Sequence, residues 1–195
     1  AETYGDTERI IGNWLKKTGN RDKVVLASKI AGGGDYTAHI RKNGFSKKGI
    51  TEAIENSLKR LQTDYMDLYQ LHWPSRGVNC FGVRDYPYKT ASKEAENHLE
   101  ILETLSDFIK QGKIKHIGLS NETPWGTMKY LQASEQYNLP KPVTIQNSYS
   151  LIHRGYEVGM SEVSMRENIG LLAYSPLAQG VLSGKYIDGN LPEGA

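Results

Sequence analysis

The chain has 195 residues, of which 38% are hydrophobic and 24% are charged, and its formal net charge at pH 7 is +2. This length allows one domain with a sizeable core. The small net charge, without a basic run interleaved with aromatic residues, argues against nucleic acid or a membrane as a partner. The single cysteine, Cys80, excludes an internal disulfide and favours a reducing compartment. With no apolar run that could span a membrane and no signal-peptide pattern, we expect a cytoplasmic protein.

The first part of the chain alternates between helical and extended patterns. Apolar residues three and four positions apart predict an amphipathic helix from Thr7 to Lys17. Val24–Ser28 is β-branched and apolar, which predicts a buried strand that finishes on Lys29. A glycine-rich loop, Gly32–Gly34, follows it. Ser46 is expected to cap a helix that runs to about Leu61.

A strand is expected next at Asp67–Leu71, and Pro74 stops it. His72 lies at its end, and histidine is the side chain whose unperturbed pKa is nearest neutrality. The segment from Pro74 to Thr90 predicts a long irregular loop. Loops of this length in compact domains are usually functional or disordered, and its aromatic residues (Phe81, Tyr86 and Tyr88) favour a functional loop.

The second part of the chain repeats the alternation. Helices are expected at Glu94–Lys110, from Pro124 onward and at Glu157–Glu167, and strands at Ile114–Leu119, Val143–Ile145 and Ile169–Ala173. The three strands end on Ser120-Asn121, Gln146-Asn147 and Tyr174-Ser175, respectively.

Five strands that alternate with helices predict a parallel α/β sheet. Apolar strands with polar residues at their carboxyl ends favour a (β/α)8 TIM barrel, whose function gathers at that end. A complete barrel needs about 250 residues. We therefore expect one partial barrel domain over residues 1–195, with about five βα units and with the first strands and the C-terminal strand missing. A doubly wound sheet is the alternative, which the absence of a Gly-x-Gly-x-x-Gly motif after any strand disfavours.

Polar side chains stand at the end of every expected strand. If the sheet closes, they converge on one mouth: Lys29, His72, Ser120, Asn121, Gln146 and Tyr174. Strands often end on polar residues because loops begin there, which explains Ser120 and Asn121. It explains Lys29 less well, because a lysine that continues a buried strand is desolvated. The four other histidines show no metal-ligand spacing and are expected to be solvated, so no metal site is predicted.

Several segments together resemble the aldo-keto reductase family, and the resemblance covers nearly the whole chain. The matching segments are Ala27–Lys29, Ser57–Leu61, Asp67–Pro74, Ile117–Thr123, Thr144–Asn147 and Leu171–Gly180, which runs on into Leu182–Tyr186. The chain has an insertion from Ser75 to Tyr88, which contains Asn79-Cys80-Phe81-Gly82. This insertion resembles the one found in the Tas-like subgroup of that family.

The family uses an aspartate, a tyrosine, a lysine and a histidine for catalysis. The resemblance assigns Lys29 and His72 to the last two, and the aspartate would precede Ala1. In one register Ala1–Gly5 matches the family's Asp-Thr-Ala-x-x-Tyr-Gly, and Tyr4 is the proton donor. In the other, which the subgroup favours, the true tyrosine also precedes this chain. A tyrosine needs a nearby cation to act as an acid, and a histidine can orient the carbonyl oxygen.

The resemblance further implies NADP(H) as cofactor. It assigns Ser120, Asn121 and Gln146 to the nicotinamide carboxamide, which needs both donors and acceptors, and Tyr174 to stacking on the ring. The pyrophosphate would be wrapped by Ser175, Pro176, Leu177, Gln179, Gly180, Leu182, Ser183, Gly184 and Lys185, with Lys185 as its charge partner. The segment that reads the 2′-phosphate would lie beyond Ala195.

The expected function is NADPH-dependent reduction of a small aldehyde or ketone to an alcohol. One alternative is a nucleotide-sensing regulatory subunit of the same fold with little turnover. Another is a barrel aldolase or isomerase that uses Lys29 as a Schiff base, which would leave Ser120-Asn121 and the segment from Tyr174 to Lys185 unexplained. The sequence indicates neither the particular carbonyl compound nor the oligomeric state.

Overall fold

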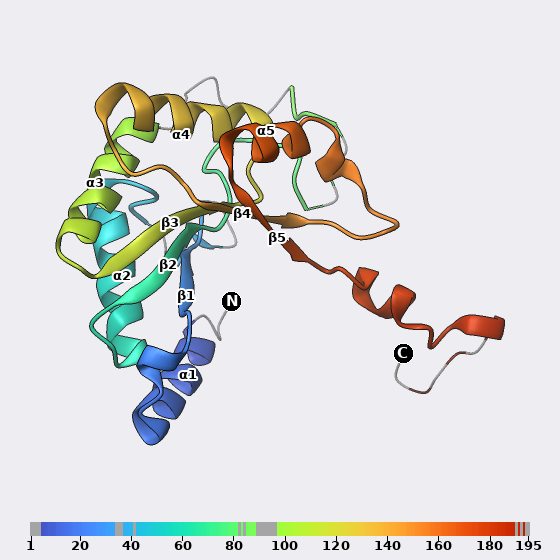
Figure 1. Ribbon diagram of the computed structural model, residues 1–195, viewed down its shortest axis with the longest axis horizontal. Helices are drawn as coiled ribbons and strands as arrows, with labels where there is room; N and C mark the ends of the chain where they lie inside the picture. The colour runs from blue at the N-terminus through green and yellow to red at the C-terminus, as the bar shows by residue number, and fades with distance from the viewer. Residues whose placement is uncertain are drawn as a thin grey trace.

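The computed structural model describes residues 5–33, 37–40, 42–81, 83, 85–88, 97–189, 191 and 193. Helices and strands alternate along the chain (Figure 1). The helices are α1 (Asp6–Thr18), α2 (Lys47–Leu61), α3 (His98–Lys110), α4 (Pro124–Tyr137) and α5 (Met160–Glu167). The strands are β1 (Ala27–Ile30), β2 (Met66–Leu71), β3 (Ile114–Ser120), β4 (Thr144–Ser148) and β5 (Gly170–Tyr174). Short 3-10 turns are η1 (Arg21–Lys23), η3 (Gly155–Glu157), η4 (Ala178–Ser183) and η5 (Ile187–Gly189).

The five strands form one parallel sheet in the order β1-β2-β3-β4-β5, as the sequence predicted. Each connection between neighbouring strands includes a helix, and the helices lie along one side of the sheet (Figure 1). In the wall of an α/β barrel, each βα unit adds its strand next to the preceding strand, and all the helices cover one face of the sheet. The described part of this chain has the same arrangement. The described strands therefore make a partial α/β barrel, with β1 and β5 at its two edges.

The helix ends follow the expected local chemistry. The Ser46 hydroxyl caps α2 by accepting a hydrogen bond from the Gly49 N–H at 3.2 Å. The Thr123 hydroxyl caps α4 in the same way, and Pro124 occupies the first turn, where a missing N–H is harmless. Gly19 ends α1 with a φ of 64°, a conformation that glycine adopts without strain.

Several boundaries differ from the sequence predictions. β1 spans Ala27–Ile30 rather than Val24–Lys29, so Lys29 lies opposite Gln70 and is followed by one more strand residue. The backbone N–H of Leu26 donates a hydrogen bond to the Asp67 carboxylate at 2.9 Å. This N–H therefore does not pair with the backbone of β2. β4 continues to Ser148 because β5 pairs with it along its whole length, so Gln146 is mid-strand.

Helix boundaries differ too. α5 begins at Met160 rather than Glu157, because Gly159 adopts a φ of 88° that a helix cannot continue through. The expected start of the third helix, Glu94, lies outside the described residues, and α3 is capped by Asn97.

The hydrophobic core fills the space between the sheet and the helices. Side chains from the helix-facing side of the strands, such as Ile30, Tyr69, Leu119 and Ile145, are at most 2% exposed. Side chains alternate between the two faces of a strand. The residues at intervening positions therefore face the opposite side, which corresponds to the barrel interior.

The prediction that the remaining histidines are solvated is wrong for His98. It is the first residue of α3 and only 8% exposed. Its ring lies 4.5 Å from that of Tyr130 and 5.9 Å from that of Trp125, both on α4. His98 therefore packs between two helices, a contact that no local pattern encodes.

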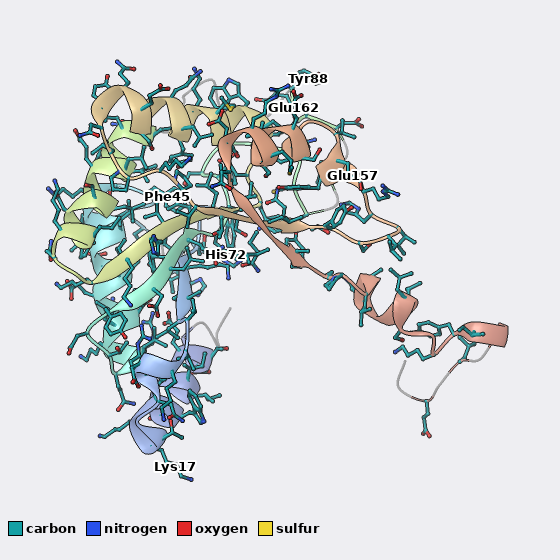
Figure 2. The ribbon with its side chains drawn as sticks, viewed as in Figure 1. Lys17, Phe45, His72, Tyr88, Glu157 and Glu162 are labelled. Carbon is teal, nitrogen blue, oxygen red and sulfur yellow. The ribbon has the colours of Figure 1, made fainter. Side chains whose placement is uncertain are left out.

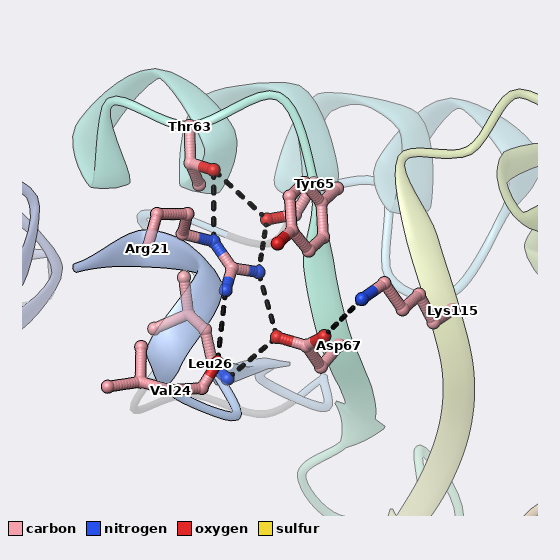
Figure 3. A network of polar contacts seen from close by, with 7 residues as sticks. All are labelled: Arg21, Val24, Leu26, Thr63, Tyr65, Asp67 and Lys115. Atoms are coloured by element: carbon pink, nitrogen blue, oxygen red, sulfur yellow. Dashed lines mark hydrogen bonds and ion pairs between the residues drawn. The ribbon is translucent and has the colours of Figure 1, made fainter. Parts of the chain in front are cut away.

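A polar network joins the amino ends of three strands (Figure 3). The Asp67 carboxylate accepts hydrogen bonds from Arg21 Nη2 at 2.8 Å, the Leu26 N–H at 2.9 Å and Lys115 Nζ at 2.7 Å. The Arg21 guanidinium also stacks 3.8 Å from the centre of the Tyr65 ring. Burial raises the pKa of Asp67, but these hydrogen bonds outweigh burial and lower the pKa to about 2. The network holds the segment before β1 against β2 and β3.

Among the residues that the structure describes, no helix combines the length and the hydrophobicity required to cross a bilayer. The same part of the chain contains no cluster of three or more His, Cys, Asp or Glu side chains suited to a metal ion.

Candidate active site at the carboxyl ends of the strands

The interior face of the sheet carries a row of polar and small residues. In the pairing register, Lys29 lies opposite Gln70, Gln70 opposite Gly118, and Gly118 opposite Thr144. A Cβ added at Gly118 would lie 2.5 Å from Thr144 Oγ1 and 3.2 Å from Gln70 Cγ. Glycine is therefore required where the side chains of the two neighbouring strands meet.

His72 directly follows β2 and continues the interior row two residues beyond Gln70. Its N–H donates to the Ile30 carbonyl at 2.9 Å, so its backbone is still held by β1. Figure 2 shows His72 near the point where the strand ends converge.

Lys29 is close enough to His72 for its positive charge to affect the pKa of the imidazole. Burial lowers the pKa of the Lys29 ammonium. Burial also lowers the pKa of His72 to about 4, and the positive charge of Lys29 acts in the same direction. The imidazole is therefore neutral at pH 7. Within the described part of the chain, no carboxylate forms an ion pair with Lys29.

Asn121 connects three strand ends. Its backbone adopts a left-handed φ of 52° just after β3, and its Nδ2 donates to the His72 carbonyl at 2.9 Å. The Tyr174 hydroxyl, from the end of β5, donates to Asn121 Oδ1 at 2.8 Å. The Ser120 hydroxyl accepts from Asn121 Nδ2 at 3.2 Å and donates to the Gln146 carbonyl at 2.8 Å. The structure thus brings together the predicted residues Ser120, Asn121, Gln146 and Tyr174.

Amide groups that could bind a ligand lie beside this network. The Gln146 side chain is partly exposed and makes no hydrogen bond with the described residues. Asn147 Nδ2 donates to the Glu122 carbonyl at 3.0 Å, whereas its Oδ1 is buried without a hydrogen-bond partner in the described part of the chain. Asn121, Asn147 and Tyr174 border an open cavity of about 1030 Å³, which Cys80 and His153 also line.

The segment that follows β5 extends away from the sheet (Figure 1). Ser175, Ala178 and Gln179 have positive φ values of 55°, 48° and 55°, and Gly180 and Gly184 have φ values of 99° and 86°. The N–H groups of Ala178 and Gly180 donate to the carbonyls of Ser175 and Leu177 at 2.8 and 3.0 Å, so the backbone of this segment forms tight turns closed by its own hydrogen bonds.

The predicted cofactor residues of this segment divide into two groups. Ser175 and Gln179 border the cavity with Tyr174, whereas the residues from Leu182 to Lys185 lie farther out. The Lys185 side chain lies back against Gly180, since a Cβ added there would be 3.1 Å from Lys185 Cε. The structure therefore does not bring Lys185 to the strand ends.

The loop after β2 packs against the loop after β1. A Cβ on Gly32 would lie 2.4 Å from the Trp73 ring, and Trp73 Nε1 donates to the Gly33 carbonyl at 3.2 Å. The Trp73 ring in turn contacts the His72 ring at 4.6 Å and the Phe81 ring at 5.8 Å. These contacts fix the backbone that carries His72.

Sequence reasoning missed several residues of this region. Gln70 was included in an apolar strand, yet it is 1% exposed and faces the interior row. β2 (Met66–Leu71) shows no alternation of polar and apolar residues, so the only signal was the single amide side chain within an apolar strand. Arg76 and Glu122 were also missed, and they form a buried ion pair beside the site. Tyr4, the candidate proton donor, lies outside the described residues.

The consecutive βα units and the polar site at the carboxyl ends of the strands define an α/β-barrel protein. The model of the aldo/keto reductase family matches residues 1–194, and the chain belongs to this family. The chain is 50% identical over 196 residues to protein tas of Escherichia coli K12, which covers 100% of this chain and 56% of that protein. The Tas-like resemblance inferred from the motifs is confirmed.

Two further comparisons agree. The chain is 40% identical over 177 residues to an aldo-keto reductase of Babesia bovis, covering 85% of this chain and 62% of that protein. A crystal structure of an aldo/keto reductase from Klebsiella pneumoniae, in complex with NADP and acetate, matches with a TM-score of 0.64 at 28% identity. It covers 95% of this chain and 52% of that one. This chain thus spans little more than half the length of these relatives.

Proposed function

We propose that the protein reduces an aldehyde or ketone to an alcohol with NADPH. The observation that carries the proposal is the cluster at the strand ends, where a half-buried lysine and a neutral histidine lie near Ser120, Asn121 and Tyr174. Membership in the aldo/keto reductase family supports it, as does the NADP bound to the Klebsiella relative.

The residues present fit a nicotinamide dinucleotide. Gln146 has an amide with no bond to the described residues, and the Asn121 carbonyl oxygen keeps a second lone pair, so both can bind a carboxamide. Tyr174 is our candidate to stack on the ring, and the segment from Ser175 to Lys185, with its positive φ values, is our candidate to wrap the phosphates. When bound, the reduced nicotinamide supplies the hydride.

The side chains of this chain would supply position and proton control. The neutral His72 can hold the carbonyl oxygen of the substrate through a ring N–H. The Lys29 ammonium would lower the pKa of a neighbouring tyrosine, which donates the proton as oxygen becomes a hydroxyl. Tyr4 is the candidate for that tyrosine in one register, whereas in the register that the Tas-like subgroup favours another tyrosine takes this role. A carboxylate is expected to accompany Lys29.

The test is the loss of NADPH absorbance by the full-length protein with a reactive aromatic aldehyde. We expect turnover with NADPH and little with NADH. Lys29→Met and His72→Ala should each lower kcat by about 100-fold or more while changing the Kd of NADPH by less than about threefold, because neither residue is assigned to cofactor binding. Lys23→Met, a change outside the site, is the control.

Each other outcome has a defined meaning. Unchanged turnover in Lys29→Met and His72→Ala would contradict the assigned roles. Tight NADPH binding without turnover on any aldehyde or ketone would favour a nucleotide-sensing regulatory protein. No binding of either nucleotide would reject the proposal.

We also propose that residues 1–195 lie within one barrel domain and that the protein is cytoplasmic. The domain proposal is supported by the continuous five-stranded sheet, and the location by the single cysteine. A small carbonyl compound is the partner that this function requires.

A further inference from the structure

A buried ion pair links the two loops that carry His72 and Asn121. Arg76 Nη1 donates to Glu122 Oε2 at 3.0 Å, and Arg76 Nη2 donates to Glu122 Oε1 at 2.5 Å. The side chains are 9% and 4% exposed, respectively. Two parallel hydrogen bonds between a guanidinium and a carboxylate fix direction as well as distance. We call the ion pair of Arg76 and Glu122 the clasp.

Neighbouring groups hold both partners of the clasp. The Arg76 guanidinium lies 4.9 Å from the centre of the Trp125 ring, and its Nη2 also donates to Thr123 Oγ1 at 3.1 Å. Glu122 Oε1 accepts the Thr123 N–H at 2.6 Å. The ion pair is therefore built into the start of α4 rather than formed by two mobile surface side chains.

Gly126 shows that the packing around the clasp depends on its exact geometry. A Cβ added at Gly126 would lie 2.3 Å from Glu122 Oε1 and 2.4 Å from Arg76 Nη2. Gly126 has no positive φ that would otherwise require glycine, and glycine weakens a helix. The first turn of α4 thus lacks a side chain at the position that the clasp occupies.

Each partner lies close in sequence to a site residue. Arg76 lies four residues after His72, and Glu122 directly follows Asn121. The bond from Asn121 Nδ2 to the His72 carbonyl, at 2.9 Å, connects the same two loops. The Glu122 carbonyl also accepts from Asn147 Nδ2, which extends the connection to β4. A shift of the clasp would therefore move His72 and Asn121 relative to each other.

We propose that Arg76 and Glu122 are positioning residues that set the placement of His72 against the nicotinamide side of the cofactor site. The inference rests on the proposed reductase function and adds two residues that act through others. A buried ion pair contributes little stability compared with apolar side chains of similar size, so stability alone does not account for it. Its directional geometry accounts for the fixed relation between the two loops.

The test compares Glu122→Gln, Arg76→Met/Glu122→Leu and the control Glu162→Gln in the full-length protein. Glu122→Gln leaves Arg76 buried without its counter-charge. The double variant removes both charges and so preserves folding if the single variant unfolds. Glu162 pairs with Arg166 at 2.7 Å on the surface of α5, with side chains 67% and 74% exposed, which makes it a matched ion pair away from the site.

Two nucleotides distinguish positioning from general loss of structure. NADPH contains the nicotinamide, whereas adenosine 2′,5′-bisphosphate contains only the adenosine end with its 2′-phosphate. In both clasp variants we expect the Kd of NADPH to rise by about fivefold and kcat to fall by about tenfold or more, because small displacements of reacting groups are costly. The Kd of adenosine 2′,5′-bisphosphate should change by less than about twofold, as should all values in Glu162→Gln.

The outcomes that overturn the inference are separate from those that overturn the proposed function. Clasp variants that match Glu162→Gln in both Kd values and in kcat would show that the clasp positions nothing. Equal weakening of both nucleotides would assign it a structural role only. If the unmutated protein binds NADPH without turnover, the reductase proposal fails, and the two Kd values still decide the inference. If it binds neither nucleotide, both fail together.

Discussion

At the scale of single residues, burial rather than residue type sets the chemistry of the site. A histidine in water is half protonated near pH 6.5. The partly buried His72 beside Lys29 instead has a pKa of about 4. It therefore stays neutral at physiological pH and acts as a hydrogen-bonding group rather than as a cation. The same burial lowers the pKa of Lys29.

The titration of His72 tests this arrangement. We expect NMR of the ring protons to give His72 a pKa near 4, and Lys29→Met to raise it because the neighbouring charge is removed. Between pH 4 and 6.5 the unfolded chain binds more protons at this position than the folded one. The contribution of His72 to stability is thus full above pH 6.5 and is lost as the pH falls toward 4. An unchanged pKa in Lys29→Met would show that the two groups are not coupled.

At the scale of secondary-structure elements, one end of the strands carries the candidate active site and the other end carries a stabilising polar network. The carboxyl ends carry the candidate active site, and the amino ends carry the network around Asp67. Asp67 satisfies the Leu26 N–H just before β1 and contacts cations from η1 and β3. Barrel proteins commonly place stability at the amino ends of the strands and function at the carboxyl ends.

Asp67→Asn should destabilise the protein by about 1–3 kcal/mol in urea unfolding, because it removes charge-assisted hydrogen bonds to Arg21 and Lys115. Asp107→Asn is the control. Its side chain is 49% exposed and 3.8 Å from the ammonium groups of Lys47 and Lys110, so a loss below about 0.5 kcal/mol is expected. Equal effects of the two changes would refute the role of the network.

The acid response of Asp67 has a definite sign. Its pKa of about 2 in the folded protein lies below the ordinary value of 3.8. Its contribution to stability is therefore present above pH 3.8 and is lost as the pH falls from 3.8 toward 2. The Asp67→Asn protein lacks this part of the acid dependence.

At the scale of the whole molecule, the described sheet has two edges and one open face. β1 and β5 each pair with a single neighbour in the described part of the chain. On β5, Leu172 faces the interior side and is 42% exposed. Unpaired strand edges and exposed apolar side chains favour association between copies.

Residues 1–195 expressed alone should therefore self-associate at micromolar concentration, as measured by size-exclusion chromatography with light scattering. Leu172→Lys should reduce the association, because it places a charge on the open face. Met165→Lys, at a residue that is 84% exposed on α5, should leave it unchanged. A monomer at every concentration would contradict this prediction.

Local patterns predicted most of the fold. Because amphipathic spacing is a property of neighbouring residues, the apolar patterns predicted the five α-helices and the five strands within the described residues, although β1 begins three residues later than expected. The errors occur where a distant residue decides. β1 begins at Ala27 partly because Asp67, 41 residues away, captures the Leu26 N–H. His98 is buried because α4 packs over it.

The sequence by itself determined that Lys29, His72, Ser120, Asn121 and Tyr174 stand at or near strand ends, since strand periodicity and chain order are local. Only the tertiary structure decided what these residues contact. The bond from Tyr174 to Asn121 spans 53 positions in the chain, and that from Arg76 to Glu122 spans 46. Such partners are chosen by the register of parallel strands and by burial, and both arise only when distant segments pack together.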